Sequence, residues 1–420
     1  MERIEISALL GAIPGVERPV VWLEDGAGRG LGRLAWGARA RHRLDWSTGP
    51  GDRLAEFRPP VARRWYGVLA YDLGLPPRAP RHNPVIGQPL VDLFEPANEL
   101  IIDLASGRVV TGDMTAVRRS AGPAVRRSVD PPSLLDRSFD QRGFESAVRR
   151  IKDFIAAGDV YQVNLSVAER FSVPASPWEV YLRLREINPS PWMGFADFGD
   201  WQLVSGSPEL LVEMGGKGRN GGTRTALSAP SALVRTRPIA GTRKKTGDPV
   251  RDAEMRAELC LDEKEQAEHR MLVDLARNDL GRVCEFGSVR VSEREVVEEY
   301  SHVFHLVSEV LGRARPDVTP WDAIRALFPG GTITGAPKIR AMEVIAELEP
   351  VGRGAYTGGL GWLGPEGAQL NILIRSAVFR DGIASVQAGA GVVWDSDPAR
   401  EWRESLRKAS AMRLALGCAE

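Results

Sequence analysis

The spacing of apolar residues changes along the chain and separates strand-like from helix-like segments. Short apolar runs such as Val20–Leu23 and Leu100–Ile102, divided by proline and glycine, predict strands and turns in the first 115 residues. Further strand-like segments cover residues 160–171, 202–213 and 287–312, the second interrupted by a Ser-Pro turn. Helical spacing is found over residues 144–157, 249–278, 321–327, 336–348 and 398–416.

The order of these segments favours an α+β architecture, because strands and helices do not alternate as they do in a doubly wound α/β fold. The Arg-, Ser- and Pro-rich stretch Arg118–Ser133 indicates an exposed connection. We therefore expect a lobe at 1–115, a connection at 116–138 and the main region at 139–420. The glycine-rich stretch Gly215–Ala232 is expected to be a surface loop.

Composition narrows the class of protein. The chain has 420 residues, 43% of them hydrophobic and 26% charged, which is typical of a globular protein with a sizeable core. Basic and acidic residues balance at 55 each, so no net field favours nucleic acid or an anionic membrane. Three scattered cysteines are too few for a disulfide framework or a zinc cluster. No signal peptide or membrane-spanning run is present, and we expect a cytoplasmic protein.

Two glutamate pairs are the main candidates for metal chemistry. Glu265 and Glu268 share one helix face, and Glu401 and Glu404 repeat this spacing on the last helix, with Lys408 one turn further on. Each pair taken alone can be a solvated helix face. If the two helices meet, the four carboxylates offer the hard oxygen ligands that Mg²⁺ prefers.

Three other side chains could take part in chemistry. Glu209 follows a Ser-Pro turn among apolar residues: if buried, its carboxyl would have a raised pKa and could act as a general acid, and otherwise it is a solvated turn residue. Arg375 lies in an apolar run and should be paired, for instance with a bound carboxylate. His305 either faces such a site or is a satisfied core histidine.

Three glycine-containing segments need separate interpretations. Pro238–Thr242 is a tight turn that exposes backbone amides and the Thr242 hydroxyl, which suits an anionic group. Gly389 and Gly391 either let the backbone approach a ligand closely or form a bulge. Gly330–Gly335 has phosphate-loop spacing, but Ala336 and Pro337 replace the required lysine and hydroxyl, so ATP binding is not supported.

Together these segments resemble the chorismate-utilising enzymes over residues 139–417, whereas residues 1–115 match only loosely. The resemblance rests on residues 158–165, 207–209, 238–242, 262–269, 274–279, 334–338, 353–358 and 395–408. It implies a large α+β fold in which two antiparallel sheets pack face to face with helices outside.

The resemblance also implies roles for individual residues. Glu268 and Glu404 match positions that bind Mg²⁺ directly, and Glu265 and Glu401 match positions that assist, usually through water. Glu209 matches the acid that protonates the departing C4 hydroxyl of chorismate. Thr242 and His305 match residues that line the pocket. The matches to positions that bind the substrate carboxylates are Tyr356, Arg375, Gly391 and Lys408, with Gly389 on the same strand.

Two positions bear on which member of the family is present. Gln162 stands where the water-adding enzymes of this family carry a lysine base, and a neutral amide cannot serve as that base, so we expect ammonia as the nucleophile. Ala240 stands where many aminodeoxychorismate synthases carry a nucleophilic lysine, and taken alone it favours an anthranilate synthase. Asn164 and Thr334, together with the absence of a Leu-Leu-Glu-Ser motif, favour aminodeoxychorismate synthases instead.

The preferred interpretation is a component I of aminodeoxychorismate synthase, of the subclass with Pro-Ile-Ala-Gly-Thr. Ammonia would add at C2 without a covalent adduct at residue 240, and a second ammonia would give 4-amino-4-deoxychorismate. The alternative is anthranilate synthase component I. None of the three cysteines lies in the Gly-x-Cys-x-Gly setting of a glutaminase nucleophile, so we expect a separate glutamine amidotransferase to supply the ammonia.

Overall fold

The computed structural model describes residues 5–26, 30–46, 53–84, 86–112, 117, 131–215 and 232–419. The strands are β1 (Val20–Asp25), β2 (Leu31–Leu44), β3 (Trp65–Leu69), β4 (Val91–Asp103), β5 (Arg108–Thr111), β6 (Ser133–Arg137), β7 (Gln162–Ser172), β8 (Trp192–Asp197), β9 (Gln202–Ser207), β10 (Leu210–Met214), β11 (Leu233–Arg237), β12 (Ile239–Lys244), β13 (Arg290–Glu299), β14 (Val303–Arg313), β15 (Gly335–Ala336), β16 (Gly359–Gly364), β17 (Gly367–Ile372), β18 (Ser376–Arg380) and β19 (Ile383–Val392). The α-helices are α1 (Ile6–Ala12), α2 (Arg53–Glu56), α4 (Gln141–Ala156), α5 (Pro177–Ile187), α6 (Pro249–Leu261), α7 (Glu263–Gly281), α8 (Pro320–Leu327), α9 (Lys338–Leu348), α10 (Pro398–Lys408) and α11 (Ser410–Leu416).

The predicted α+β fold with antiparallel sheets is confirmed. Among the described residues, 19 strands join in one hydrogen-bonded network whose ladders are antiparallel. The long strands β2 and β4 connect its parts: Gly32–Trp36 of β2 pairs with β1, and Val91–Phe94 of β4 pairs with β3. A register shift between Ala38 and Ala40 marks an irregularity of the kind that bends a sheet. Strands from distant parts of the chain share an apolar cluster that includes Val21, Phe94 and Leu203.

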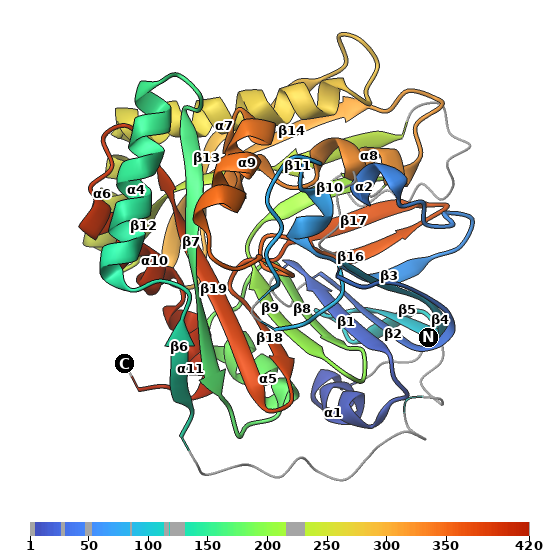
Figure 1. The fold of residues 1–420 in the computed structure, drawn as a ribbon. Helices are drawn as coiled ribbons and strands as arrows, with labels where there is room; N and C mark the ends of the chain where they lie inside the picture. Colours follow the sequence, from blue (N-terminus) through green and yellow to red (C-terminus); the bar gives the residue numbers. More distant parts are fainter. Residues whose placement is uncertain are drawn as a thin grey trace.

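Helices cover the outside of the strands. In Figure 1, α7 runs across the top of the molecule and α4 lies along the outer side of β7. The sequence explains the placement of α4, because Phe144, Val148, Ile151 and Phe154 recur at helical spacing and are buried against Val163 of β7. Helix α10 packs against both α4 and β19.

Two of the predicted helices are interrupted. The sequence indicated one helix over residues 249–278, but α6 ends at Leu261 and α7 begins at Glu263. Asp262 adopts an extended conformation and its Oδ1 accepts hydrogen bonds from the backbone N–H groups of Lys264 and Glu265, both at 3.1 Å. Aspartate is among the best N-cap residues, and the cap starts a new helix whose first two turns carry Glu265 and Glu268. The helix predicted over residues 398–416 is likewise divided, at Ala409.

The connections can be assessed only in part. Residues 118–130 and 216–231 lie outside the described residues, so the exposed connection and the glycine-rich loop stay predictions. Within the connection expected at 116–138, Ser133–Arg137 forms β6, which pairs with β7. The division of the chain at 116–138 also stays a prediction. Strands from before and after this stretch pair with each other, β1 with β8 and β3 with β16.

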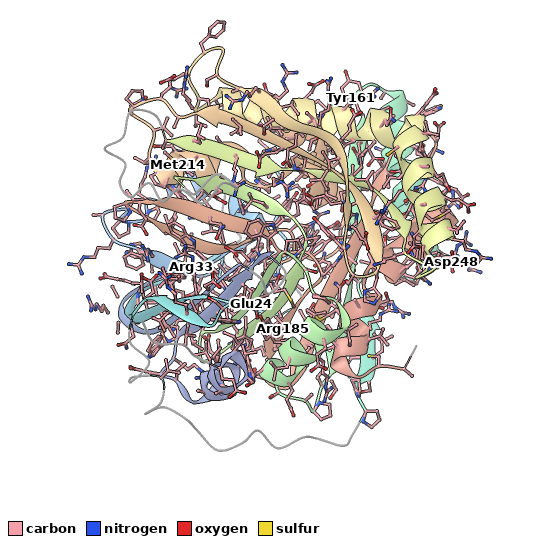
Figure 2. All side chains as sticks on the ribbon, turned by 180° about the vertical axis from the view of Figure 1, so that it is seen from behind. Glu24, Arg33, Tyr161, Arg185, Met214 and Asp248 are labelled. Atoms are coloured by element: carbon pink, nitrogen blue, oxygen red, sulfur yellow. The ribbon has the colours of Figure 1, made fainter. Side chains whose placement is uncertain are left out.

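A buried carboxylate joins helix α5 to the sheet. Glu24 of β1 is buried and accepts hydrogen bonds from Trp22 Nε1 at 2.9 Å and from the hydroxyl of Tyr181. Arg185 Nε lies 2.9 Å from the same carboxylate, and Figure 2 shows the two labelled side chains next to each other. The three donors compensate the cost of burying this charge.

A second buried ion pair lies at the centre of the fold. Arg353 and Glu349, each 3% exposed, are joined by two hydrogen bonds, Nη2 to Oε1 at 2.7 Å and Nε to Oε2 at 2.9 Å. The guanidinium also donates to the carbonyls of Ile333 at 2.8 Å and Asn164 at 2.6 Å. Glu349 in turn accepts from the backbone N–H and the hydroxyl of Ser166. The pair therefore ties β7 and the segment before β15 to the end of α9.

Replacing one partner should be costly. We expect Arg353→Ala to lower the free energy of unfolding by about 3–5 kcal/mol, because it leaves the Glu349 charge buried without its partner. Urea denaturation of both proteins measures the loss. The exposed pair between Arg149 and Glu145 is the matched control, and Arg149→Ala should change stability by less than about 1 kcal/mol. Equal stability of the two variants would contradict the central role of the Arg353 pair.

Candidate active site

Glutamates from α7 and α10 meet on one side of the candidate site. Burial raises the pKa of Glu268, and the neighbouring charges of Glu265 and Glu404 raise it further. Burial also raises the pKa of Glu404, but the Lys408 ammonium, 2.9 Å from its Oε1, and nearby arginines lower it overall. Glu401 is buried, and its pKa is raised by burial and by Glu404. The Glu404 charge acts on Glu268, so these two members of the glutamate pairs lie near each other across α7 and α10.

The four carboxylates differ in their present partners. Glu268 Oε1 accepts a hydrogen bond from Gln162 Nε2 at 2.7 Å, and Glu265 Oε1 lies 3.3 Å from Arg243 Nη1. No three His, Cys, Asp or Glu side chains within the described ranges form a ready-made metal cage. Mg²⁺ commonly takes only one or two protein carboxylates and keeps several waters, so Glu268 and Glu404 are a donor set that fits this ion.

Two glycines of β19 leave room beside these groups. Strand β19 pairs with β7 so that Gly391 is opposite Asn164 and Gly389 is opposite Ser166. A Cβ atom at Gly391 would lie 2.4 Å from Gln162 Nε2 and 3.3 Å from Glu268 Oε1. Any side chain there would displace Gln162 from Glu268. The interpretation of close backbone approach is therefore preferred to a bulge, since this stretch of the ladder has an unbroken register.

On the other side of the site, Glu209 is a buried carboxyl between β9 and β10. It is 4% exposed, and burial raises its pKa to about 7, against the opposing effect of its hydrogen bonds and of Arg375. Thr332 Oγ1 donates to Glu209 Oε1 at 2.7 Å, and the Ile239 N–H donates to the same oxygen at 3.4 Å. Near neutral pH this group can therefore hold and release a proton, as the sequence suggested.

His305 connects Arg375 to the turn that carries Thr242. Arg375 Nη2 lies 3.1 Å from His305 Nε2, and since arginine can only donate, Nε2 accepts this hydrogen bond. Burial, with the Arg375 charge, lowers the pKa of His305 to about 3, so the ring is neutral and Nδ1 carries the hydrogen. Nδ1 faces Thr242 Oγ1 at 3.1 Å and the Gly241 carbonyl at 3.3 Å. The two alternatives for His305, a residue facing the site and a satisfied core histidine, are therefore both correct. It is buried, its ring nitrogens have partners, and it contacts Arg375 and Thr242.

Arg375 is held without a carboxylate partner among the described residues. Its backbone has a φ of +51°, a left-handed conformation that is uncommon for a residue with a side chain. Burial lowers its pKa, and the Tyr300 and Glu209 side chains act in the opposite direction. A half-buried guanidinium that has no carboxylate partner among the described residues suits an anionic ligand.

The structure places the remaining candidates at different positions. Ala240 is buried on β12 opposite Leu306, and the register shifts between Ala240 and Thr242, where Gly241 has a φ of +72°. A Cβ at Gly241 would lie 3.2 Å from Glu265 Oε2, so this turn borders the glutamates.

Tyr356 is buried with its ring 5.6 Å from the Arg353 guanidinium and lines a small internal cavity with Ser376 and Gln387.

Sequence reasoning missed three contributors. Thr332, within the segment that had only been rejected as a phosphate loop, holds Glu209. Tyr300 stacks edge-on against His305 at 5.1 Å between ring centroids. Arg243 binds Glu265 and Asp262. A hydroxyl between glycines was a weak signal for Thr332, but nothing in the sequence spacing marked the other two.

Comparisons with known proteins identify the family. The family model for chorismate binding enzymes matches residues 33–414. Over 283 residues (67% of this chain, 57% of the relative) the chain is 50% identical to aminodeoxychorismate synthase component 1 of Bacillus subtilis. Over 388 residues (85% and 74%) it is 39% identical to anthranilate synthase component 1 of Cereibacter sphaeroides. The chain thus spans little more than half the length of the Bacillus relative.

Solved structures share the fold. Anthranilate synthase component I from Streptococcus pneumoniae superposes with a TM-score of 0.75 at 31% identity, covering 91% of this chain and 92% of that one. The menaquinone-specific isochorismate synthase from Escherichia coli superposes at 0.73 with 20% identity, over 97% and 91%, and this likeness concerns the fold alone. No helix in the described part of the chain is both long and apolar enough to cross a membrane. From its family match and its similarity to these relatives, the chain belongs to the chorismate-binding enzyme family.

Proposed function

We propose that the protein is component I of an aminodeoxychorismate synthase, which aminates chorismate to 4-amino-4-deoxychorismate with ammonia and Mg²⁺. The observation that carries the proposal is the neutral amide of Gln162, which donates a hydrogen bond to Glu268 on the side of the site where the glutamates of α7 and α10 lie. An amide cannot deprotonate water at neutral pH, whereas ammonia needs no base to be nucleophilic. The 50% identity to the aminodeoxychorismate synthase of Bacillus subtilis supports the choice of product.

Each side of the site has a separate task in this reaction. Glu209, with its pKa near 7, gives a proton to the C4 hydroxyl as the bond from carbon to oxygen breaks, and Thr332 keeps the carboxyl aimed. Arg375 and Lys408 offer positive charge to the two carboxylates of chorismate. Glu268 and Glu404 would bind Mg²⁺ directly, and Glu265 and Glu401 would assist through water. When bound, the ion supplies positive charge to a substrate carboxylate and orients the ring.

The neighbourhood of residue 240 determines whether an adduct with the protein can form. Ala240 presents a methyl group, which cannot act as a nucleophile, and it lies beside the turn that borders Glu265. The first amination is therefore proposed to occur at C2 by free ammonia, giving 2-amino-2-deoxyisochorismate. A second ammonia then adds at C4 and expels the C2 amine. The anthranilate synthase relatives favour the alternative in which the first amine is retained and anthranilate forms.

A glutamine amidotransferase is proposed as the ammonia source. The relatives are named as component 1 of their enzymes. In this chain burial raises the pKa values of the Cys284 and Cys418 thiols, which opposes the thiolate form that a glutaminase needs, and Cys260 is an exposed residue on α6.

The identity of the product tests the proposal directly. The pure protein with chorismate, Mg²⁺ and ammonium should give a non-aromatic amine that becomes p-aminobenzoate only when a lyase is added. Chromatography with mass detection identifies it. Glutamine in place of ammonium should give no turnover without the partner subunit. Fluorescent anthranilate as the main product would contradict the proposal and favour anthranilate synthase component I.

Glu209 should determine the alkaline limb of the pH profile. The acid must be protonated to act, so kcat/KM for chorismate should fall as pH rises through about 7, measured at a constant concentration of unprotonated ammonia. Glu209→Gln should lower kcat by about 10²–10⁴-fold and abolish this limb. In the wild-type protein the hydrogen bond from Thr332 lowers the pKa of Glu209. Thr332→Val removes this bond, so the pKa should rise and the alkaline limb should move to higher pH. An unchanged profile in both variants would exclude Glu209 as the acid.

Glu268 and Glu404 should control the Mg²⁺ requirement. Glu268→Gln or Glu404→Gln should raise the Mg²⁺ concentration for half-maximal activity by about tenfold to a hundredfold, since each removes a charged ligand. Calorimetric titration with Mg²⁺ alone gives a second readout. Glu263→Gln, on the exposed first turn of α7, is the matched control and should behave as wild type. Equal Mg²⁺ dependence in all variants would place the ion elsewhere.

A further inference from the structure

Asn164 carries a buried side-chain oxygen without a partner. The residue is 8% exposed, and its Oδ1 has no hydrogen-bond partner among the described residues. Its backbone is well held, because its N–H donates to the Thr334 carbonyl at 2.8 Å and its carbonyl accepts from Arg353 at 2.6 Å. Buried polar atoms are normally satisfied. A rigidly placed acceptor with no donor in the fold points to a donor that arrives with a ligand.

The surroundings of Asn164 are open and contain a second free acceptor. A Cβ atom at Gly389 would lie 2.7 Å from Asn164 Oδ1, so the glycine at this position leaves space over the amide. Gln162 lies two residues earlier on β7 and therefore on the same face of the strand. Its Oε1 is also buried without a partner, while its Nε2 is committed to Glu268.

Asn164 is connected through the backbone to both sides of the site. The Gln162–Glu268 contact is on one side of it along β7. On the other side, Asn164 is bonded to Thr334, two residues after the Thr332 that holds Glu209. Short backbone connections therefore link Asn164 both to the carboxylate side of the site and to the segment that holds the acid.

We propose that Asn164 Oδ1, with Gln162 Oε1 as its neighbour, accepts N–H bonds from the incoming ammonia and so positions the nucleophile. Ammonia has three N–H donors and one lone pair. Two amide oxygens can orient the donors, and neither can protonate the lone pair, which stays available for attack. The assignment rests on the proposed function in that it requires ammonia to be the nucleophile, and it adds a specificity-determining contact for that small molecule.

Steady-state kinetics with ammonium test the assignment. Asn164→Leu keeps the branched shape of the side chain, is somewhat larger and removes the acceptor. It should raise KM for ammonium about tenfold while KM for chorismate stays within about twofold. Asn164→Asp keeps an acceptor oxygen and should hold KM for ammonium within about threefold of wild type. The contrast between the two variants separates an acceptor role from a packing role.

Thermal unfolding of each variant shows whether the fold is intact, and Asn164→Ala replaces Asn164→Leu if the larger side chain does not fit. An unchanged KM for ammonium in the variants without the acceptor, or an equal rise in KM for chorismate, would overturn the assignment. If wild-type protein uses ammonium but forms anthranilate, only the proposed product fails and the Asn164 result still stands. If wild-type protein does not use ammonium at all, both proposals fail.

Discussion

The buried pair between Arg353 and Glu349 is the constraint on which the site depends. One guanidinium reaches the carboxylate at the end of α9, the Ile333 carbonyl and the Asn164 carbonyl. Its bonds fix β7, which carries Gln162 and Asn164, against the segment that carries Thr332. The acid and the glutamate side of the site are therefore positioned by one network. Two charges buried this deeply are stable only while each keeps its partner, which makes the arrangement rigid.

Burial then sets the chemistry of the site in opposite ways on its two sides. Glu209 faces few compensating charges, so desolvation brings its pKa to about 7 and makes the carboxyl a proton donor. Around Glu268 and Glu404, like charges lie together and Lys408 compensates them only in part. This excess of negative charge is what a divalent cation would neutralise. Both environments come from the same fold, and neither needs an unusual residue.

The sequence located those elements whose apolar periodicity is clear locally, but it did not indicate helix α5 or strands β16–β19. Strands β9 and β10 with their Ser-Pro turn, helix α4 and strand β14 follow the spacing that predicted them. The residue types of the site were visible for the same reason: paired glutamates at helical spacing, an arginine in an apolar run and a carboxyl beside a turn. Prediction failed where a single polar side chain changes the backbone direction, as Asp262 does between α6 and α7.

What the sequence by itself determined is thus a part of the elements, the family resemblance and the chemical types of the site residues. Tertiary structure alone decided which of them meet. Thr332 and Glu209 are 123 positions apart and Gln162 and Glu268 are 106 apart, yet each pair shares a hydrogen bond. The state of His305, the raised pKa of Glu209 and the free oxygen of Asn164 are also decided there. The physical reason is that burial and hydrogen-bond partners depend on segments distant in the chain, whereas propensity and periodicity depend only on neighbours.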